Sequence, residues 1–102
     1  MTDPRLAKSW KATEIMLRQA SDFLLEPGRF TIPEKSLDEY KSYLRANELE
    51  LAMLELEETA REHGAKSGFW RRLKKAAQQM KLQNKAAEYE SEFHKALSRS
   101  ND

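Results

Sequence analysis

Residues 67–80, SGFWRRLKKAAQQM, decide the fold class of this chain. Apolar side chains recur every three or four positions and basic side chains fill the positions between them, which is the pattern of an amphipathic helix. Ser67 can cap the start of this helix. The apolar arc comprises Phe69, Trp70, Leu73, Ala76, Ala77 and Met80. A helix with one such face needs other helices to cover it.

The segment just before it predicts another helix. Asn47 followed by Glu50 resembles a capping box, so we expect a break at Ala46/Asn47, although one continuous helix is the alternative. This helix should end at His63, with Gly64 as a left-handed C-cap. Its inner face comprises Leu49, Ala52, Met53, Leu56 and Ala60. Leu51 and Leu54 point to the opposite side, which favours a central, buried helix over one exposed for a partner.

Further upstream, Ser36-Leu37-Asp38-Glu39 is a capping box that starts a helix with Leu37, Tyr40 and Leu44 inside. Residues 26–35 carry Pro27, Gly28 and Pro33, which indicates a loop with Phe30 and Ile32 packed beneath it. Asp3-Pro4 predicts the start of a first helix that runs to about Leu25.

A fifth helix should follow a break near Gln83-Asn84 and fade into a polar tail from about Ser98. Its inner positions are Ala86, Tyr89, Phe93 and Leu97. The chain is therefore predicted to be all-α: a compact antiparallel bundle of four to five helices, forming a single helical domain over residues 1–102. The predicted core comprises Leu6, Trp10, Leu17, Leu24, Leu37, Leu44, Leu49, Met53, Leu56, Phe69, Leu73, Met80 and Phe93.

The composition is typical of a small domain with a hydrophilic surface. The 102 residues include 39% hydrophobic and 34% charged residues and no cysteine, so the core must hold the fold without disulfides. The start of the chain lacks the apolar run of a secretion signal, and no stretch could span a bilayer. We expect a cytoplasmic protein that has no membrane contact.

The formal net charge of +1 hides a strong segregation. Residues 31–63 carry nine acidic against four basic residues, whereas residues 64–102 carry nine basic against four acidic ones. Such segregation bears on association with a partner and not on the fold.

No catalytic chemistry is indicated by the residues. His63 lies at a helix end, where a cation favours the helix dipole, and His94 forms an i, i+4 surface pair with Glu90. Metal-ligand spacings, glycine-rich phosphate loops and a nucleophile elbow are all missing from the sequence. The dense carboxylates, including Glu57, are typical of a charged helix face. We predict no catalytic residue, no cofactor site and no metal site.

Two charged faces remain as candidate binding surfaces. The acidic stretch from Asp38 to Glu62 could meet a basic protein, with Tyr40 and Tyr43 as aromatic anchors, or it could simply keep the chain soluble. The basic face could follow a phosphate backbone with Trp70 beside it, although a solvated face is the default interpretation. That basic face comprises Arg71, Lys74, Lys75, Lys81 and Lys85.

One spacing pattern carries a resemblance to a known family. Its first part is Tyr43-Leu44-x-x-Asn47-Glu48-x-x-Leu51-Ala52-x-x-x-Leu56-Glu57, and its second is Phe69-Trp70-x-x-Leu73-x-x-Ala76-Ala77-x-x-Met80. Over roughly residues 37–82 this pattern resembles small all-helical bacterial immunity proteins of contact-dependent growth inhibition and related polymorphic toxin systems. The resemblance implies a stoichiometric inhibitor that blocks the active site of a cognate toxin, often a nuclease, or an adjacent surface. The balanced net charge departs from the acidic character expected of an inhibitor of a basic nuclease.

Together these observations predict a toxin-neutralising immunity protein, a monomer or weak dimer whose partner is a cognate protein toxin. We expect the interface at Tyr43, Glu48, Glu50, Glu55, Glu58 and Glu62. One rival is a nucleic-acid-associated regulator that uses the basic face, which we do not favour. Another is a scaffold protein that self-associates through Leu51 and Leu54.

Overall fold

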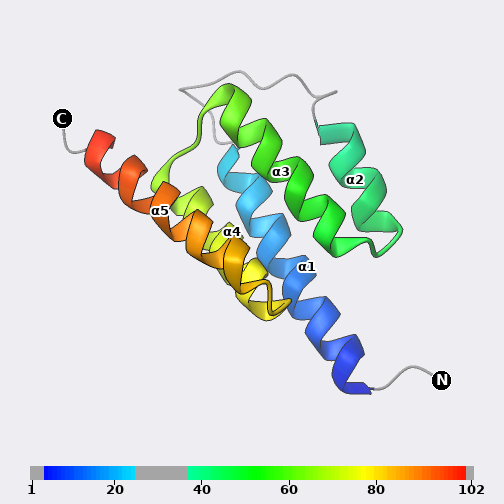
Figure 1. Ribbon diagram of the computed structural model, residues 1–102. Coiled ribbons are helices and arrows are strands. Elements are labelled where there is room, and N and C mark those ends of the chain that lie inside the picture. Colours follow the sequence, from blue (N-terminus) through cyan, green and yellow to red (C-terminus); the bar gives the residue numbers. More distant parts are fainter. Residues whose placement is uncertain (1–3, 25–36, 101–102) are drawn as a thin grey trace.

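Five helices follow one another in an all-α globule without strands in the part of the chain that is described (Figure 1). The structure, a computed structural model, describes the backbone of residues 4–24 and 37–100 and the side chains of residues 10–24 and 37–98. The helices are α1 (Pro4–Leu24), α2 (Asp38–Arg45), α3 (Leu49–His63), α4 (Ser67–Gln79) and α5 (Gln83–Ser100). Successive helices run up and down, so the predicted antiparallel bundle is confirmed (Figure 1).

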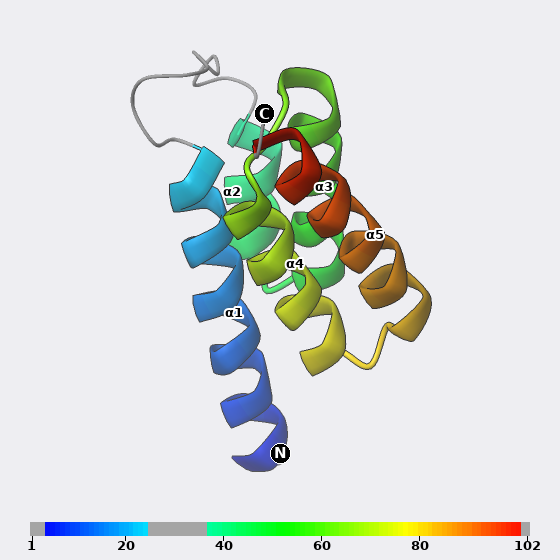
Figure 2. The same cartoon turned by 90° about the vertical axis from the view of Figure 1, so that its left-hand side faces the viewer.

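Helix α4 occupies the middle of the bundle, between α1 and α5, and the α2–α3 pair covers the remaining side (Figure 2). Its apolar arc explains this position, because Phe69, Trp70 and Leu73 are all buried. The two aromatic rings meet edge to face at 5.0 Å, and Tyr89 of α5 lies 5.9 Å from the Trp70 ring. Aromatic pairs of this geometry stabilise a core beyond the area that they bury.

Turns of the same type end α2 and α4. In each case the residue after the C-cap, Asn47 or Lys81, has a φ of 61°, in the left-handed region. The amide of Asn47 donates to the carbonyl of Leu44, and that of Glu48 donates to Tyr43. This pair of hydrogen bonds is a Schellman motif, and the corresponding bonds from Lys81 and Leu82 complete a second one. Each motif reverses the chain within a few residues.

Several predicted helix boundaries differ from those in the structure. Asn47 ends α2 instead of capping α3, whose N-cap is Glu48 without a side-chain hydrogen bond. Ser67 is the first residue of α4 and Lys66 is its N-cap. Gly64 does end α3 at positive φ, but its ψ of 156° lies outside the left-handed helical region that we expected. Helix α5 continues to Ser100, past Ser98, where we expected it to fade.

Most of the predicted core is buried as expected. Met80 and Phe93 are only partly buried, and the core gains side chains that the prediction omitted, chiefly Trp70 and Tyr89. The confirmed residues are Leu17, Leu24, Leu37, Leu44, Leu49, Met53, Leu56, Phe69 and Leu73. The side chain of Leu6, the helix caps at Asp3 and Ser36, and the predicted loop with Phe30 and Ile32 lie outside the described residues.

Three apolar residues that periodicity placed inside the bundle are exposed. Leu97 of α5, a predicted inner position, is 37% exposed. Trp10 is 40% exposed, because α1 extends past the other helices at its N-terminal end (Figure 1). Leu51 is 42% exposed, while Leu54 on the same side of α3 packs partly against the core. Helix α3 is therefore an outer helix with one buried face, and the expected central packing of α3 is wrong.

We expect Gly68→Ala to destabilise the protein although alanine favours helices. A methyl group at Gly68 would lie 2.7 Å from the Phe23 ring, which also faces the Arg72 guanidinium at 5.9 Å. Overpacking of this kind costs about 1–3 kcal/mol, against a helix-propensity gain of about 1 kcal/mol. In a Phe23→Ala background the same substitution should become stabilising. Urea unfolding of the four proteins measures this, and equal effects in both backgrounds would show that α1 and α4 do not meet here.

Candidate functional site

Carboxylates of α2 and α3 gather on one surface, here called the acidic face: Glu39, Glu55, Glu58 and Glu62. Burial raises the pKa of Glu55, and the neighbouring charges of Glu58 and Glu39 raise it further. The crowding therefore spans both helices. No ion pair to a described residue neutralises any of the four. An acidic surface without internal counter-charges attracts a basic partner.

Apolar side chains lie among these acids. On the α3 side Leu51 is 42% exposed and Leu54 is half-buried. On the α2 side Tyr43 is half-buried and lies one helical turn from Glu39, hence on the same side of the helix. An apolar centre with a charged rim is the usual anatomy of a protein interface.

The six predicted interface residues do not all share this surface. Glu55, Glu58, Glu62 and Tyr43 belong to it or border it. Glu48 is exposed at the turn between α2 and α3. Glu50 instead lies on the rim of a separate groove. It points to a different side of α3 from Glu55, because five positions along a helix do not bring two residues onto the same side. Of the six predicted interface residues, only the other four therefore belong to one continuous surface.

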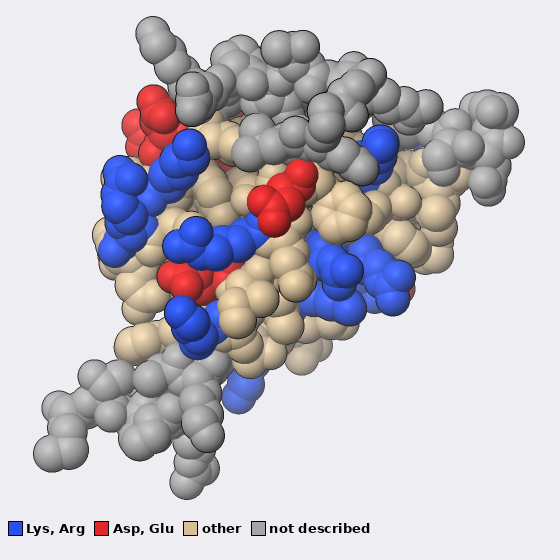
Figure 3. Space-filling view, turned by 180° about the vertical axis from the view of Figure 1, so that it is seen from behind, with Lys and Arg blue, Asp and Glu red and all other residues tan. Residues whose placement is uncertain are grey.

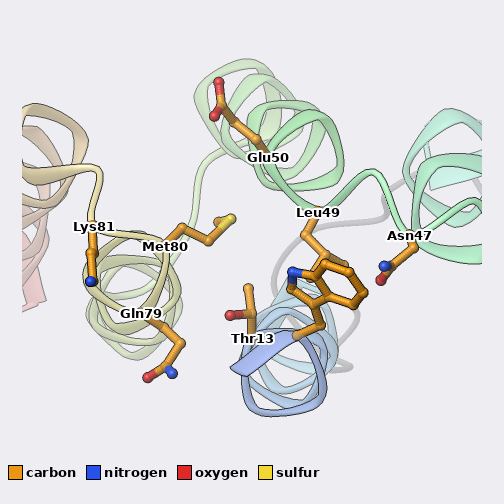
Figure 4. A pocket seen from close by; sticks show the side chains of 8 residues that line it. Thr13, Asn47, Leu49, Glu50, Gln79, Met80 and Lys81 are labelled. Atoms are coloured by element: carbon orange, nitrogen blue, oxygen red, sulfur yellow. The ribbon is translucent and has the colours of Figure 1, made fainter. Parts of the chain in front are cut away.

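That groove, here called the Trp10 groove, opens between α1 and the adjoining ends of α3 and α4. Its volume is about 430 Å³, and its apolar lining comprises Trp10, Leu49 and Met80. Thr13 of α1 and Met80 of α4 extend into the space between the helices (Figure 4). The two left-handed residues, Asn47 and Lys81, both lie at its margin. The helix-ending turns thus shape this groove as well as reversing the chain.

A buried ion cluster joins α3 to α5 around Glu57, which is 9% exposed. One carboxylate oxygen accepts hydrogen bonds from the Tyr89 hydroxyl at 2.6 Å and from Lys85 Nζ at 3.1 Å. The other accepts from Arg61 Nε at 3.0 Å. Arg61 also pairs with Glu88 at 2.8 Å and lies 5.6 Å from the centre of the Trp70 ring. Side chains from three helices are fixed relative to one another by this cluster.

The electrostatics of the cluster are those of a structural ion network. Burial by itself would raise the pKa of Glu57, but the hydrogen bonds from Tyr89, Lys85 and Arg61 together lower it. The pKa of Tyr89 is raised by burial and by the adjacent carboxylate. Both shifts move the pKa of the group further from neutral pH, whereas a general acid or base needs a pKa near neutral pH. The expectation that Glu57 belongs to a solvated face is wrong.

Sequence reasoning missed this cluster although a signal was present. Glu57 and Arg61 are separated by four residues on one helix, as in an ion pair. Glu57 also falls at the edge of the arc that includes Met53 and Ala60, which are both buried. A carboxylate at the border of an apolar arc needs a partner, and the partner's helix could not be named from sequence.

The predicted basic face is divided by the fold. Lys85 pairs with Glu57 and Glu88, and Lys74 pairs with Glu90 at 3.0 Å. Trp70, which could have stacked on a base, is only 2% exposed. Arg71 and Lys81 are exposed. Little of the predicted face is therefore available as an uninterrupted cationic surface.

Within the described residues the two histidines do not gather with other groups into a site. His94 packs edge to face against Phe93 at 5.5 Å. Its expected partner, Glu90, bonds Lys74, and this hydrogen bond together with the charges of Lys74 and His94 lowers the pKa of the Glu90 carboxyl. Among the described residues no three histidine or acidic side chains gather so that they could hold a metal ion. None of the helices in the described ranges is long and apolar enough to cross a membrane.

Comparison with known proteins adds no further constraint, since no family model, no curated protein and no solved structure matches this chain. The functional assignment therefore depends on the surfaces described above.

Glu57→Gln should destabilise the fold by about 2 kcal/mol, between the values typical of exposed and of buried ion pairs, because Lys85 and Arg61 lose their shared counter-charge. The lowered pKa of Glu57 means that its contribution is present above the ordinary carboxyl value of 4.5 and is lost as pH falls through its folded value. The difference between wild type and variant should thus shrink in acid. Urea unfolding at several pH values tests this, with the exposed Glu62→Gln as control. A Glu57→Gln effect as small as the control's would rule out the structural role.

Proposed function

We propose that this protein binds a basic protein partner through the acidic face, and that it is an immunity protein that neutralises a cognate bacterial toxin domain in the cytoplasm. The observation that supports this proposal is the acidic face, whose carboxylates form no ion pair with the residues that the structure describes, with Leu51 exposed beside it. The family resemblance over residues 37–82 includes α2 and α3, the two helices that form this surface. The toxin would be bound with its active site, or a surface next to it, covered.

The physical steps of binding follow from the surface. Crowded carboxylates accelerate the encounter with a cationic protein and fix its orientation. Leu51, Leu54 and Tyr43 then bury apolar area at contact, which slows dissociation. A basic group placed against Glu55 would also relieve the repulsion that raises its pKa. Because α2 and α3 are already packed through Leu44 and Leu49, little ordering is needed on binding.

The two rival functions receive less support. Nucleic-acid binding would need the basic face, but Trp70 is buried and Lys74 and Lys85 are paired with carboxylates. Self-association through Leu51 would place the acidic face of one copy against that of another in a two-fold dimer. Like charges across an interface oppose such contact, so a partner of opposite charge fits the surface better.

Reversing three charges of the acidic face should abolish the electrostatic acceleration of toxin binding. We expect the variant Glu55→Lys/Glu58→Lys/Glu62→Lys to associate with its toxin more than tenfold more slowly at low salt, and the difference should narrow as salt screens the charges. The partner to use is the toxin domain encoded beside this reading frame, with rates measured by surface plasmon resonance. Cells that co-express the toxin should lose protection.

The matched control is Arg71→Glu/Lys75→Glu/Lys81→Glu, which reverses charges on α4 outside the acidic face. It should leave neutralisation unchanged. Equal association rates for the wild type and the acidic-face variant would remove this face from the interface. A gene neighbourhood without any toxin domain would contradict the immunity function itself.

Leu51→Ser should separate binding from folding. The side chain is already 42% exposed, so we expect the free energy of unfolding to change by less than about 0.5 kcal/mol. Loss of a central apolar contact should nonetheless speed dissociation of the toxin complex about tenfold or more. Ile15→Ser on α1, where the side chain is 46% exposed, is the matched control and should leave the complex unchanged. Identical dissociation rates for both variants would place the interface elsewhere.

A further inference from the structure

A second polar cavity lies between α1 and α2, apart from the acidic face. This cavity, the α1–α2 cleft, has a volume of about 460 Å³. Its polar lining comprises Arg18, Ser21 and Asp22 of α1 and Tyr40, Lys41 and Arg45 of α2. Seen from behind, basic side chains gather on this side of the molecule over α1 and α2, with a few acidic ones among them (Figure 3). Three cations against one carboxylate make the lining net positive.

The cations of the cleft have little internal neutralisation. Lys41 and Arg45 are exposed and form no ion pair with any residue that the structure describes. Among the described residues Arg18 pairs with Glu14 alone, at 3.8 Å, and its side chain is 62% exposed. They lie on two different helices, so the fold, and not the sequence, brings them around one space.

A buried hydroxyl of the cleft lacks a hydrogen-bond partner. Tyr40 is 3% exposed, and within the described part of the chain its hydroxyl makes no hydrogen bond. Burial raises its pKa, while the nearby Ser21 and Arg18 lower it. The Ser21 hydroxyl donates to the carbonyl of Arg18 at 2.8 Å, so its proton is not available to the phenol, and its oxygen is not placed to accept the proton of the phenol.

An unpaired buried hydroxyl normally destabilises the folded state, and such groups in folded proteins call for an explanation. A phenol that stays protonated is a hydrogen-bond donor. Beside two guanidinium groups and an ammonium group, the acceptor that suits this donor is an anionic oxygen.

We propose that the α1–α2 cleft is a binding site for a phosphate group, either inorganic phosphate or the phosphate of a small monoester. The Tyr40 hydroxyl donates to one phosphate oxygen, and Arg18, Lys41 and Arg45 neutralise the others. A tetrahedral dianion carries more negative charge and more acceptor oxygens than a single carboxylate, which suits donors that approach from both helices. Asp22 opposes the ligand and limits its affinity.

The site is independent of the proposed toxin interface. It uses the Lys41 and Arg45 side of α2, whereas the acidic face uses Glu39 and the carboxylates of α3. Occupancy would link α1 to α2, two helices that otherwise meet mainly through α3. Phosphate should therefore raise the thermal stability of the whole chain by mass action.

Thermal unfolding with and without ligand tests the proposal. Sodium phosphate, phosphoserine and adenosine monophosphate are each compared with sodium chloride at the same ionic strength. We expect wild type to gain thermal stability with at least one phosphate ligand, and its amide resonances over 18–22 and 40–45 to shift saturably in NMR spectra. A response to inorganic phosphate identifies the free ion as sufficient, while a response to the esters alone identifies an organic phosphate.

Tyr40→Phe keeps the ring and removes only the donor. Without ligand this variant should be as stable as wild type or more stable, because an unpaired hydroxyl is lost. Its phosphate affinity should fall about tenfold, the effect of losing one hydrogen bond of about 1.4 kcal/mol to a charged group. Lys41→Ala should weaken binding similarly, Asp22→Asn should tighten it, and Arg71→Ala on α4 should leave it unchanged. Equal responses of wild type and Tyr40→Phe to phosphate, or no response of wild type beyond that to chloride, would overturn the proposal.

Discussion

Burial of the apolar arc of α4 is the constraint on which the other helices depend. Phe69, Trp70 and Leu73 must leave water, and two flanking helices are needed to cover an arc of that width. Helix α1 approaches α4 closely at Gly68, where a larger residue would meet the Phe23 ring. Helix α5 covers the other side through Tyr89, whose ring lies beside Trp70. The polar ends of Tyr89 and of the neighbouring Arg61 then require partners within the bundle, and Glu57 provides one for both.

Neighbouring carboxylates on α3 consequently have opposite roles. Glu57 is held by three donors and its pKa falls, whereas the pKa of Glu55 rises through burial and through the adjacent charges of Glu58 and Glu39. The first stabilises the contact between α3 and α5. The second lies on a surface whose charges repel one another and are relieved when a cationic group approaches. Two positions along α3, or about 200° of helix rotation, separate a structural acid from one that is suited to binding.

The two proposed binding functions follow from these environments. An acidic face on α2 and α3, with Leu51 exposed beside it, fits a basic protein such as a toxin domain. On the other side of α2, the cations around Tyr40 fit a phosphate group. Helix α2 therefore contributes to two surfaces of opposite charge, and each can be altered without disturbing the other. The short reversal at Asn47 holds α2 against α3, the two helices that carry the acidic face.

Local pattern determined much of this protein by itself. The period of apolar residues in 67–80 and in the other helical segments, together with the signals for helix starts and ends, predicted an all-α fold, five helices with nearly correct limits, and most of the buried side chains. Burial of an amphipathic face depends chiefly on spacing along one helix. Only the tertiary structure decided which helix protrudes and exposes Trp10, that Leu51 faces water, and that Asn47 ends one helix instead of starting the next. The Glu57 cluster and the α1–α2 cleft likewise combine side chains from helices distant in sequence. Their distances depend on how whole helices pack, and no spacing along a single chain segment encodes that.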